Sequence, residues 1–198
     1  MRKFTLLGFI LLITVTAWSQ DKEYKTLVDF DQVRISGLGG PFMQFTALDG
    51  EFAHLMGGGG AILVGDFFFG GYGLGLTNTI YVDPTKDPDY INEDQLNVSH
   101  GGFWLGYSLF GDRAIHVTFS SLIGWGQISV GRDYGDYIQD GIFTVSPTME
   151  VELNLTQFFR LGVGASYNLY TFVNNIPGYT ASDFSAPGGF LSFKFGWF

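Results

Sequence analysis

Ionisable side chains fall on the polar side of segments in which apolar and polar residues alternate. They are Arg34, His116, Glu150, Glu152, Arg160 and Lys194. Acids and bases held together away from water either compensate one another's charge or pass protons and ions along. Because the last four lie on three consecutive segments, we expect them to approach one another. An interior salt-bridge network is the main prediction, and a proton or ion path is the alternative.

A catalytic arrangement is a second hypothesis for part of the same set. His116, Ser120 and Glu150 lie on adjacent segments. A serine nucleophile needs a base, and the base an orienting acid, within hydrogen-bond reach. No supporting motif surrounds these residues. The sequence therefore predicts no catalytic residue, no metal site and no cofactor.

Strands must position these side chains. In one segment Phe143, Val145 and Val151 alternate with Thr144 and Glu150, which is the period of a strand with one apolar and one polar face. Eight such segments can be counted, at residues 32–46, 54–65, 68–82, 98–110, 113–128, 140–154, 158–172 and 187–198. Short turns alternate with longer connections, which lie at residues 48–53, 83–97, 129–139 and 173–186. An even strand number with this alternation predicts an antiparallel up-and-down barrel.

Composition narrows the class of protein. The 198 residues carry 10 Lys and Arg against 19 Asp and Glu, and the net charge of −9 argues against nucleic acid as a partner. There is no Cys, so neither disulfides nor thiolate metal sites are expected. Mean hydropathy is +0.19, although no segment after the N-terminus is apolar enough for a spanning helix. A large-cored soluble domain and a membrane barrel both remain open on these grounds.

The first residues have the pattern of an export signal. Arg2 and Lys3 precede an apolar stretch, and Ala17 and Ser19 are small residues at positions suited to a signal peptidase. We expect cleavage near Ser19-Gln20. The predicted division is a cleaved signal peptide at residues 1–19, a short segment at 20–31 and the barrel at 32–198.

The last strand ends on aromatic residues. Phe193, Phe195 and Trp197 share one face, and Phe198 is the final residue. With the strand pattern, this end resembles the small eight-stranded outer-membrane barrels of Gram-negative bacteria, of the OmpX and OmpA-barrel type. The resemblance covers the whole chain after the signal peptide and rests on pattern rather than on a diagnostic motif. It implies that these four residues form a signal for the barrel-assembly machinery.

The resemblance implies an all-β transmembrane barrel with both termini in the periplasm. Eight strands leave an interior just wide enough for side chains, so we expect the charged network and Trp104 to fill the lumen. Glycines and serines on the inward face would relieve crowding there. Tyr81, Trp125, Tyr170 and Trp197 are candidates for aromatic girdles at the membrane interfaces.

Carboxylates are concentrated in the loop after the third strand. They are Asp83, Asp87, Asp89, Glu93 and Asp94, with Lys86 as the one base among them. Flexible carboxylates can collect Ca²⁺, but no EF-hand spacing is present. A solvated acidic loop is the main prediction, and contact with a cation or partner is the alternative.

These features predict an outer-membrane protein with a structural or surface-interaction role and no enzymatic activity. The expected partners are outer-membrane lipid and lipopolysaccharide, the assembly machinery and another outer-membrane protein. Some barrels of this type modify lipid A, so a lipid-modifying enzyme is one alternative and a narrow solute channel another. A soluble secreted β-sandwich or lipocalin-like binder, with its apolar face turned inward, is the third.

Overall fold

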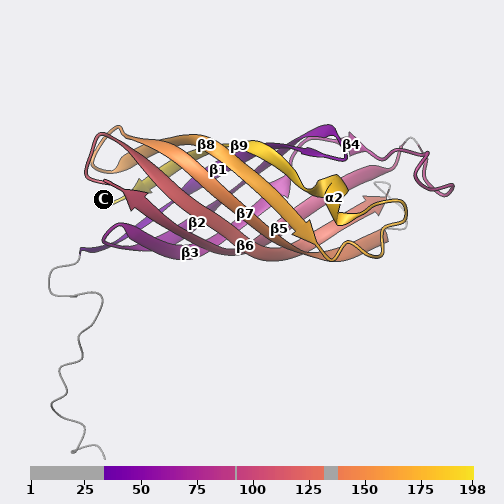
Figure 1. Cartoon of the computed structure of the whole chain (residues 1–198), viewed down its shortest axis with the longest axis horizontal. Helices are drawn as coiled ribbons and strands as arrows, with labels where there is room; N and C mark the ends of the chain where they lie inside the picture. The colour runs from indigo at the N-terminus through magenta and orange to yellow at the C-terminus, as the bar shows by residue number, and fades with distance from the viewer. Residues whose placement is uncertain (1–33, 92, 132–137) are drawn as a thin grey trace, which may run out of the picture. The chain divides into compact units, whose positions relative to one another are not determined.

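The computed structural model describes residues 34–91, 93–131 and 138–198, and these form a closed antiparallel barrel (Figure 1). Its long strands are β1 (Ile35–Leu48), β2 (Glu51–Val64), β3 (Phe67–Leu76), β5 (Gln95–Leu109), β6 (Ile115–Gly131), β7 (Ile138–Asn154), β8 (Phe159–Thr171) and β9 (Ala186–Gly196). Two short elements accompany them, β4 (Ile80–Tyr81) and α2 (Ala181–Phe184). Pairing of β9 with β1 and of β3 with β5 closes the sheet, which confirms the predicted eight-stranded barrel.

The two ends of the barrel differ. Tight connections join β2 to β3, β5 to β6 and β7 to β8 at the end where the chain finishes, called here the turn end (Figure 1). The longer connections lie at the opposite end, called here the loop end. Among the described residues no helix has the length and apolar character needed to cross a membrane.

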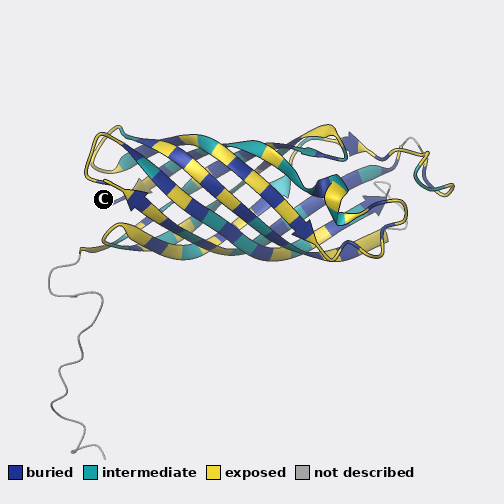
Figure 2. Cartoon of the chain, in the orientation of Figure 1, coloured by how far each residue is buried: buried dark blue, intermediate teal, exposed yellow. Residues whose placement is uncertain are grey.

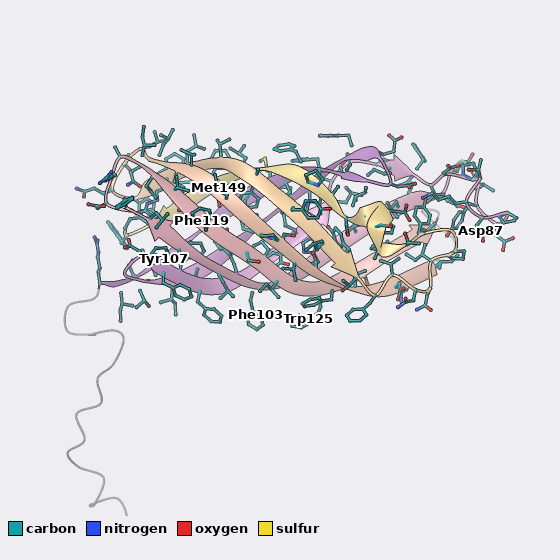
Figure 3. The ribbon with its side chains drawn as sticks, in the orientation of Figure 1. Asp87, Phe103, Tyr107, Phe119, Trp125 and Met149 are labelled. Carbon is teal, nitrogen blue, oxygen red and sulfur yellow. The ribbon has the colours of Figure 1, made fainter. Side chains whose placement is uncertain are left out.

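Burial alternates along the strands, so that the ribbon appears as a chequerboard of buried and exposed residues (Figure 2). The inward side chains of β7, β8 and β9 include Glu150, Asn168 and Lys194, each at most 2% exposed. Large apolar side chains point outward, and Phe103, Phe119 and Trp125 lie along the outer wall (Figure 3). An apolar face turned outward contradicts the soluble sandwich or lipocalin-like alternative.

Three details differ from the sequence prediction. The connection expected at residues 48–53 is a two-residue turn, Asp49-Gly50, with φ of 53° and 79°. This is the Asp-Gly hairpin turn that requires positive φ at both positions. The strand predicted at 68–82 ends at Leu76 and resumes as β4. Tyr170 is 2% exposed and points into the barrel, so it cannot belong to an outer girdle, whereas Trp125 is 60% exposed.

In β3 the faces are opposite to the general expectation of glycines inside and apolar side chains outside. Tyr72 and Leu74 are buried inside the barrel, and Gly71, Gly73 and Gly75 occupy the outward positions. The glycines of β3 therefore do not relieve crowding in the lumen. A strand that carries no charged residue gives no sequence signal for which face is inside.

Candidate functional site

The buried charges of the lumen form one cluster. Lys194 Nζ donates to Glu152 Oε1 at 2.6 Å and to Glu150 Oε1 at 3.2 Å. Glu152 Oε2 lies 3.1 Å from His116 Nε2, and the Ser192 hydroxyl donates to Glu150 Oε2 at 2.5 Å. All five side chains are at most 4% exposed. The two carboxylates are thus compensated by one central ammonium group and its neighbours.

Strand register brings these residues together. His116 pairs with Glu152 across β6 and β7, and Arg160 pairs with Lys194 across β8 and β9. Between β7 and β9 lies β8, where Gly162 stands opposite Glu152. A Cβ at Gly162 would overlap Glu150 Oε2 and Ser192 Oγ. Glycine at this position therefore lets the β7 carboxylates reach across β8 to β9.

The two arginines of the predicted network behave differently. Arg160 is 5% exposed, and its Nη1 lies 3.8 Å from Glu152 Oε2, a longer contact than that of Lys194. Arg34 is exposed and lines a pocket at the turn end. The structure thus gathers His116, Glu150, Glu152, Arg160 and Lys194, and it places Arg34 outside their cluster.

Aromatic rings fill the lumen beside the charges. Trp104 is fully buried, with ring centroids 5.4 Å from Phe42 and 5.0 Å from Phe68. Phe190 packs on Phe42 at 5.4 Å. Lys194 Nζ lies 5.2 Å from the centre of the Trp104 ring. Charged and aromatic side chains together occupy the cross-section of the barrel at this level.

A second polar group lies on the loop-end side of these rings. Tyr72 Oη is 3.0 Å from His100 Nδ1, and Gln44 Nε2 donates to Asn168 Oδ1 at 3.0 Å. The Tyr170 hydroxyl is 3.5 Å from His100 Nε2. Sequence reasoning missed His100, although this residue lies within the strand predicted at 98–110 and shares the inward parity of Trp104.

No catalytic triad forms from the residues considered for one. His116 contacts Glu152 rather than Glu150, and Ser120 Oγ has no hydrogen-bond partner among the described residues. A nucleophile without a base contact is not activated in this arrangement.

The acidic loop at the loop end is packed rather than loose. Tyr90 and Tyr179 are 5% and 6% exposed and belong to one buried cluster with Val82, Ile176 and Phe184. The Tyr90 hydroxyl donates to the carbonyl of Pro177 at 2.9 Å. Burial raises the pKa of Tyr179 to about 12. Residues 82–91 therefore dock onto the segment that precedes β9.

Lys86, in the acidic loop, contacts two other connections at the loop end. Its ammonium group forms an ion pair with Asp49 in the β1–β2 turn and lies 3.7 Å from Asp183 in α2. It also lies 4.1 Å from the centre of the Tyr179 ring. The single base of the acidic loop is thus used inside the protein.

The loop carboxylates mostly organise turns. Asp83 Oδ1 accepts from the backbone N of Thr85 at 2.8 Å and from its hydroxyl, and these bonds lower the pKa of Asp83. Asp87 Oδ1 accepts from the N of Asp89 at 2.9 Å, and Asp94 is buried. Glu93 is exposed. Across the described residues, no three acidic or histidine side chains converge as metal ligands would.

The predicted assembly residues lie at the turn end. Phe195 and Trp197 are 41% and 65% exposed and face outward, as Phe193 does by its position in β9. The strand ends at Gly196, so Phe198 lies beyond the alternation. Its ring stacks on the Arg160 guanidinium at 3.7 Å from the ring centre. Recognition of these residues by an assembly machinery remains a prediction.

Solved structures share this architecture. The crystal structure of Neisserial surface protein A (NspA) aligns with a TM-score of 0.58 and 11% identity, covering 82% of this chain and 96% of that chain. The chain has the fold of a small eight-stranded outer-membrane barrel.

A second structure is that of Ail, the attachment invasion locus protein of Yersinia pestis, in complex with the heparin analogue sucrose octasulfate. It aligns with a TM-score of 0.49 and 10% identity, covering 83% of this chain and 98% of that chain. No protein-family model and no curated protein matches the sequence.

Proposed function

We propose that the chain is an integral protein of the bacterial outer membrane with a filled lumen and a surface-interaction role. The main support for this proposal is the contrast between the two faces of the sheet, because charged side chains point inward and large apolar side chains point outward. The exposed set includes Ile62, Phe67, Phe69, Phe103, Tyr107, Phe119, Trp125, Met149, Val163 and Leu169. Lipid hydrocarbon suits such a surface, and a closed ladder leaves no backbone group unpaired in it.

The proposed orientation follows from the connections. Short turns face the periplasm in barrels of this type, and longer loops face outward. The turn end, with Trp197 and Phe198, would then lie at the periplasmic rim. Tyr81, at the loop end and 58% exposed, would lie near the outer interface.

Cell fractionation tests the membrane assignment. The expected result is recovery of the chain in the outer-membrane fraction, with resistance to extraction at alkaline pH. Recovery in the soluble periplasmic or extracellular fraction would contradict it, since outward Phe and Trp side chains would then have no apolar surroundings.

A filled lumen predicts the absence of a wide pore. The cluster around Lys194 and the rings around Trp104 occupy the interior, and eight strands enclose little additional space. Planar-bilayer recordings of the purified protein are expected to show no stable single-channel conductance. Discrete, long-lived conductance steps would instead support the alternative of a channel.

The loop end is the proposed contact surface. Asp83, Asp89 and Glu93 are exposed on a loop that is held in place by Tyr90, and Asp87 lies towards the far tip of this end (Figure 3). Fixed carboxylates select partners by charge, and preorganised loops lose less entropy on binding. Such a surface suits another outer-membrane protein, a surface polysaccharide or lipopolysaccharide bridged by divalent cations.

Charge-only substitutions test this contact surface, because Asn and Gln keep an oxygen that can accept the turn hydrogen bonds such as those from Thr85 to Asp83. The triple variant Asp83→Asn, Asp89→Asn, Glu93→Gln retains Tyr90 and the buried Asp94. It is expected to fold into the membrane as the parent does and to lose the partners that co-purify with it. Asp112→Asn, in a turn at the opposite end, is the matched control. Retention of every partner by the triple variant would contradict the proposed role of the loop.

A further inference from the structure

The outer wall of the barrel has a hollow of about 590 Å³, called here the wall hollow. Its floor is bare backbone on two neighbouring strands, at Gly73 and Gly75 of β3 and Gly101 of β5. Met56 and Trp125, which are 43% and 60% exposed, stand at its sides. The wall hollow therefore opens toward the surroundings of the barrel and not into the lumen.

Glycine continues beyond this floor. On β2, Gly58 lies beside Gly73, and Gly60 lies beside Gly71. A Cβ at Gly58 or Gly101 would crowd a carbonyl oxygen of the next strand at 2.9 Å, so the fold itself requires those two glycines. A Cβ at Gly73 would meet no described atom within 4 Å, and at Gly60 and Gly71 the nearest atom would be 3.7 Å and 3.5 Å away. Glycine weakens a strand and often marks close approach of another molecule to the backbone.

Aromatic rings border the wall hollow. The ring centroids of Phe69 and Phe103 are 5.9 Å apart, those of Phe103 and Trp125 6.4 Å, and those of Trp125 and Phe143 5.4 Å. Phe103 and Trp125 project from the outer wall (Figure 3). These four rings are called here the aromatic ridge. One face of the barrel thus carries a raised, rigid edge next to a depression.

A face with a ridge beside a hollow is complementary to itself. In a two-fold contact, each copy places its own ridge against the hollow of the other. Association inside lipid depends on packing, because hydrocarbon is as apolar as the protein, and small residues let two backbones approach closely. Aromatic rings lose little conformational freedom when they pack, whereas a flexible acyl chain has to be ordered. Shape therefore favours a second copy over a lipid chain as the occupant.

Neutral polar groups favour the same occupant. Ser99 and Gln127 line the wall hollow, and an alkyl chain offers them no hydrogen bond. The described lining residues include no Lys or Arg, so a lipid phosphate would find no cation there. A second copy brings the same hydroxyl and amide groups, and a Gln amide can both donate and accept.

We propose that two copies of the chain associate in the membrane through this face, with the aromatic ridge of each copy in the wall hollow of the other. The inference rests on the proposed outer-membrane location, because only there does this wall lie in lipid. Both copies then cross the membrane in the same direction. The two-fold axis therefore runs along the membrane normal, and the two turn ends lie on the same side.

Energy transfer between labelled copies of the full chain in lipid vesicles tests the contact. The chain has no Cys, so Asp112→Cys, exposed in the β5–β6 turn, can carry the dyes. Transfer is expected to exceed the level that random proximity gives at the same protein-to-lipid ratio. Gly73→Leu fills the wall hollow and is expected to weaken association about tenfold or more. Trp125→Ala, which shortens the aromatic ridge, is expected to have a similar effect.

Two further variants are matched controls. Gly189→Leu adds the same side chain to an outward position of β9, beside Phe45, where the nearest atom to the new Cβ would be 4.0 Å away. Phe119→Ala removes an outward ring of β6 that is 47% exposed and lies outside the aromatic ridge. Both variants are expected to associate as the parent does.

Flotation of the same vesicles separates this proposal from the proposed membrane location. A chain that does not float with the lipid contradicts the location, and the two-fold contact with it. A parent that floats but shows only random transfer overturns the contact alone and leaves a membrane lipid as the occupant of the wall hollow. Unchanged association of Gly73→Leu, or an equal loss in Gly189→Leu, also overturns it.

Discussion

At the residue scale, one buried lysine holds the charges of the lumen together. Lys194 contacts Glu150 and Glu152, and none of the three is more than 2% exposed. Replacing Lys194 by Met is expected to lower the free energy of unfolding by about 3–5 kcal/mol, because two carboxylates would remain buried without their main partner. Urea-induced unfolding in lipid vesicles measures the change.

A rescue experiment separates lost charge compensation from lost packing. Adding Glu150→Gln and Glu152→Gln to Lys194→Met is expected to recover part of the lost stability, because neutral amides cost less to bury than carboxylates. The exposed Arg113→Gln is expected to change stability by less than about 0.5 kcal/mol. A triple variant less stable than Lys194→Met alone would contradict the compensation account.

At the scale of elements, the close approach of the β2 and β3 backbones depends on glycine at particular positions. A Cβ at Gly57 would overlap the carbonyl oxygen of Gly73, whereas a Cβ at Gly73 would meet no described atom within 4 Å. Gly57→Ala is therefore expected to destabilise the barrel by about 1–3 kcal/mol through overpacking. Gly73→Ala is expected to be neutral or slightly stabilising. Folding yields in vesicles check the pair, and equal effects would contradict the register.

The docked segment around α2 predicts a pH dependence at the loop end. Burial by itself raises the pKa of Asp183, but hydrogen bonds from Thr180 and the charge of Lys86 lower this pKa below its ordinary 3.8. A carboxyl whose pKa is lower in the folded than in the unfolded protein stabilises the fold at pH values above its unfolded-state pKa. This stabilisation is lost as the pH falls through the folded-state pKa. Limited proteolysis of residues 173–185 should therefore increase below about pH 4.

Asp183→Asn provides the control for this pH dependence. The variant should be cleaved more readily than the parent at neutral pH, since it weakens the contact with Lys86. It should also show a smaller increase in cleavage on acidification. A parent protein whose loop cleavage is unchanged between neutral and acid pH would show that Asp183 does not hold the segment.

Strands were predictable from the sequence where one face carries charge. In β7 and β8, Glu150, Glu152 and Arg160 mark the inward face, and both strand boundaries fell within two residues of those observed. In β3 neither face carries charge, and the inward residues are Tyr72 and Leu74 rather than the expected glycines. Docking of residues 82–91 onto the segment that contains α2 joins parts far apart in the chain, so no local pattern could indicate it.

At the scale of the whole molecule, the barrel has three parts with different chemical character: an outer wall, an interior and two ends. The apolar outer wall suits lipid, the charged and aromatic interior fills the lumen, and the two ends present different polar surfaces. The loop end has exposed carboxylates around Asp89, and the turn end has the pocket beside Arg160. Variants at either end should leave the other end and the membrane insertion unchanged.

The most direct test of the account measures which face of a strand meets lipid. The chain has no Cys, so single cysteines at Thr118, Phe119, Leu122 and Ile123 in β6 can carry a spin label in reconstituted vesicles. Accessibility to oxygen, which concentrates in hydrocarbon, is predicted to be high at 119 and 123 and low at 118 and 122. High values at 118 and 122, or no alternation along β6, would contradict the barrel wall proposed here.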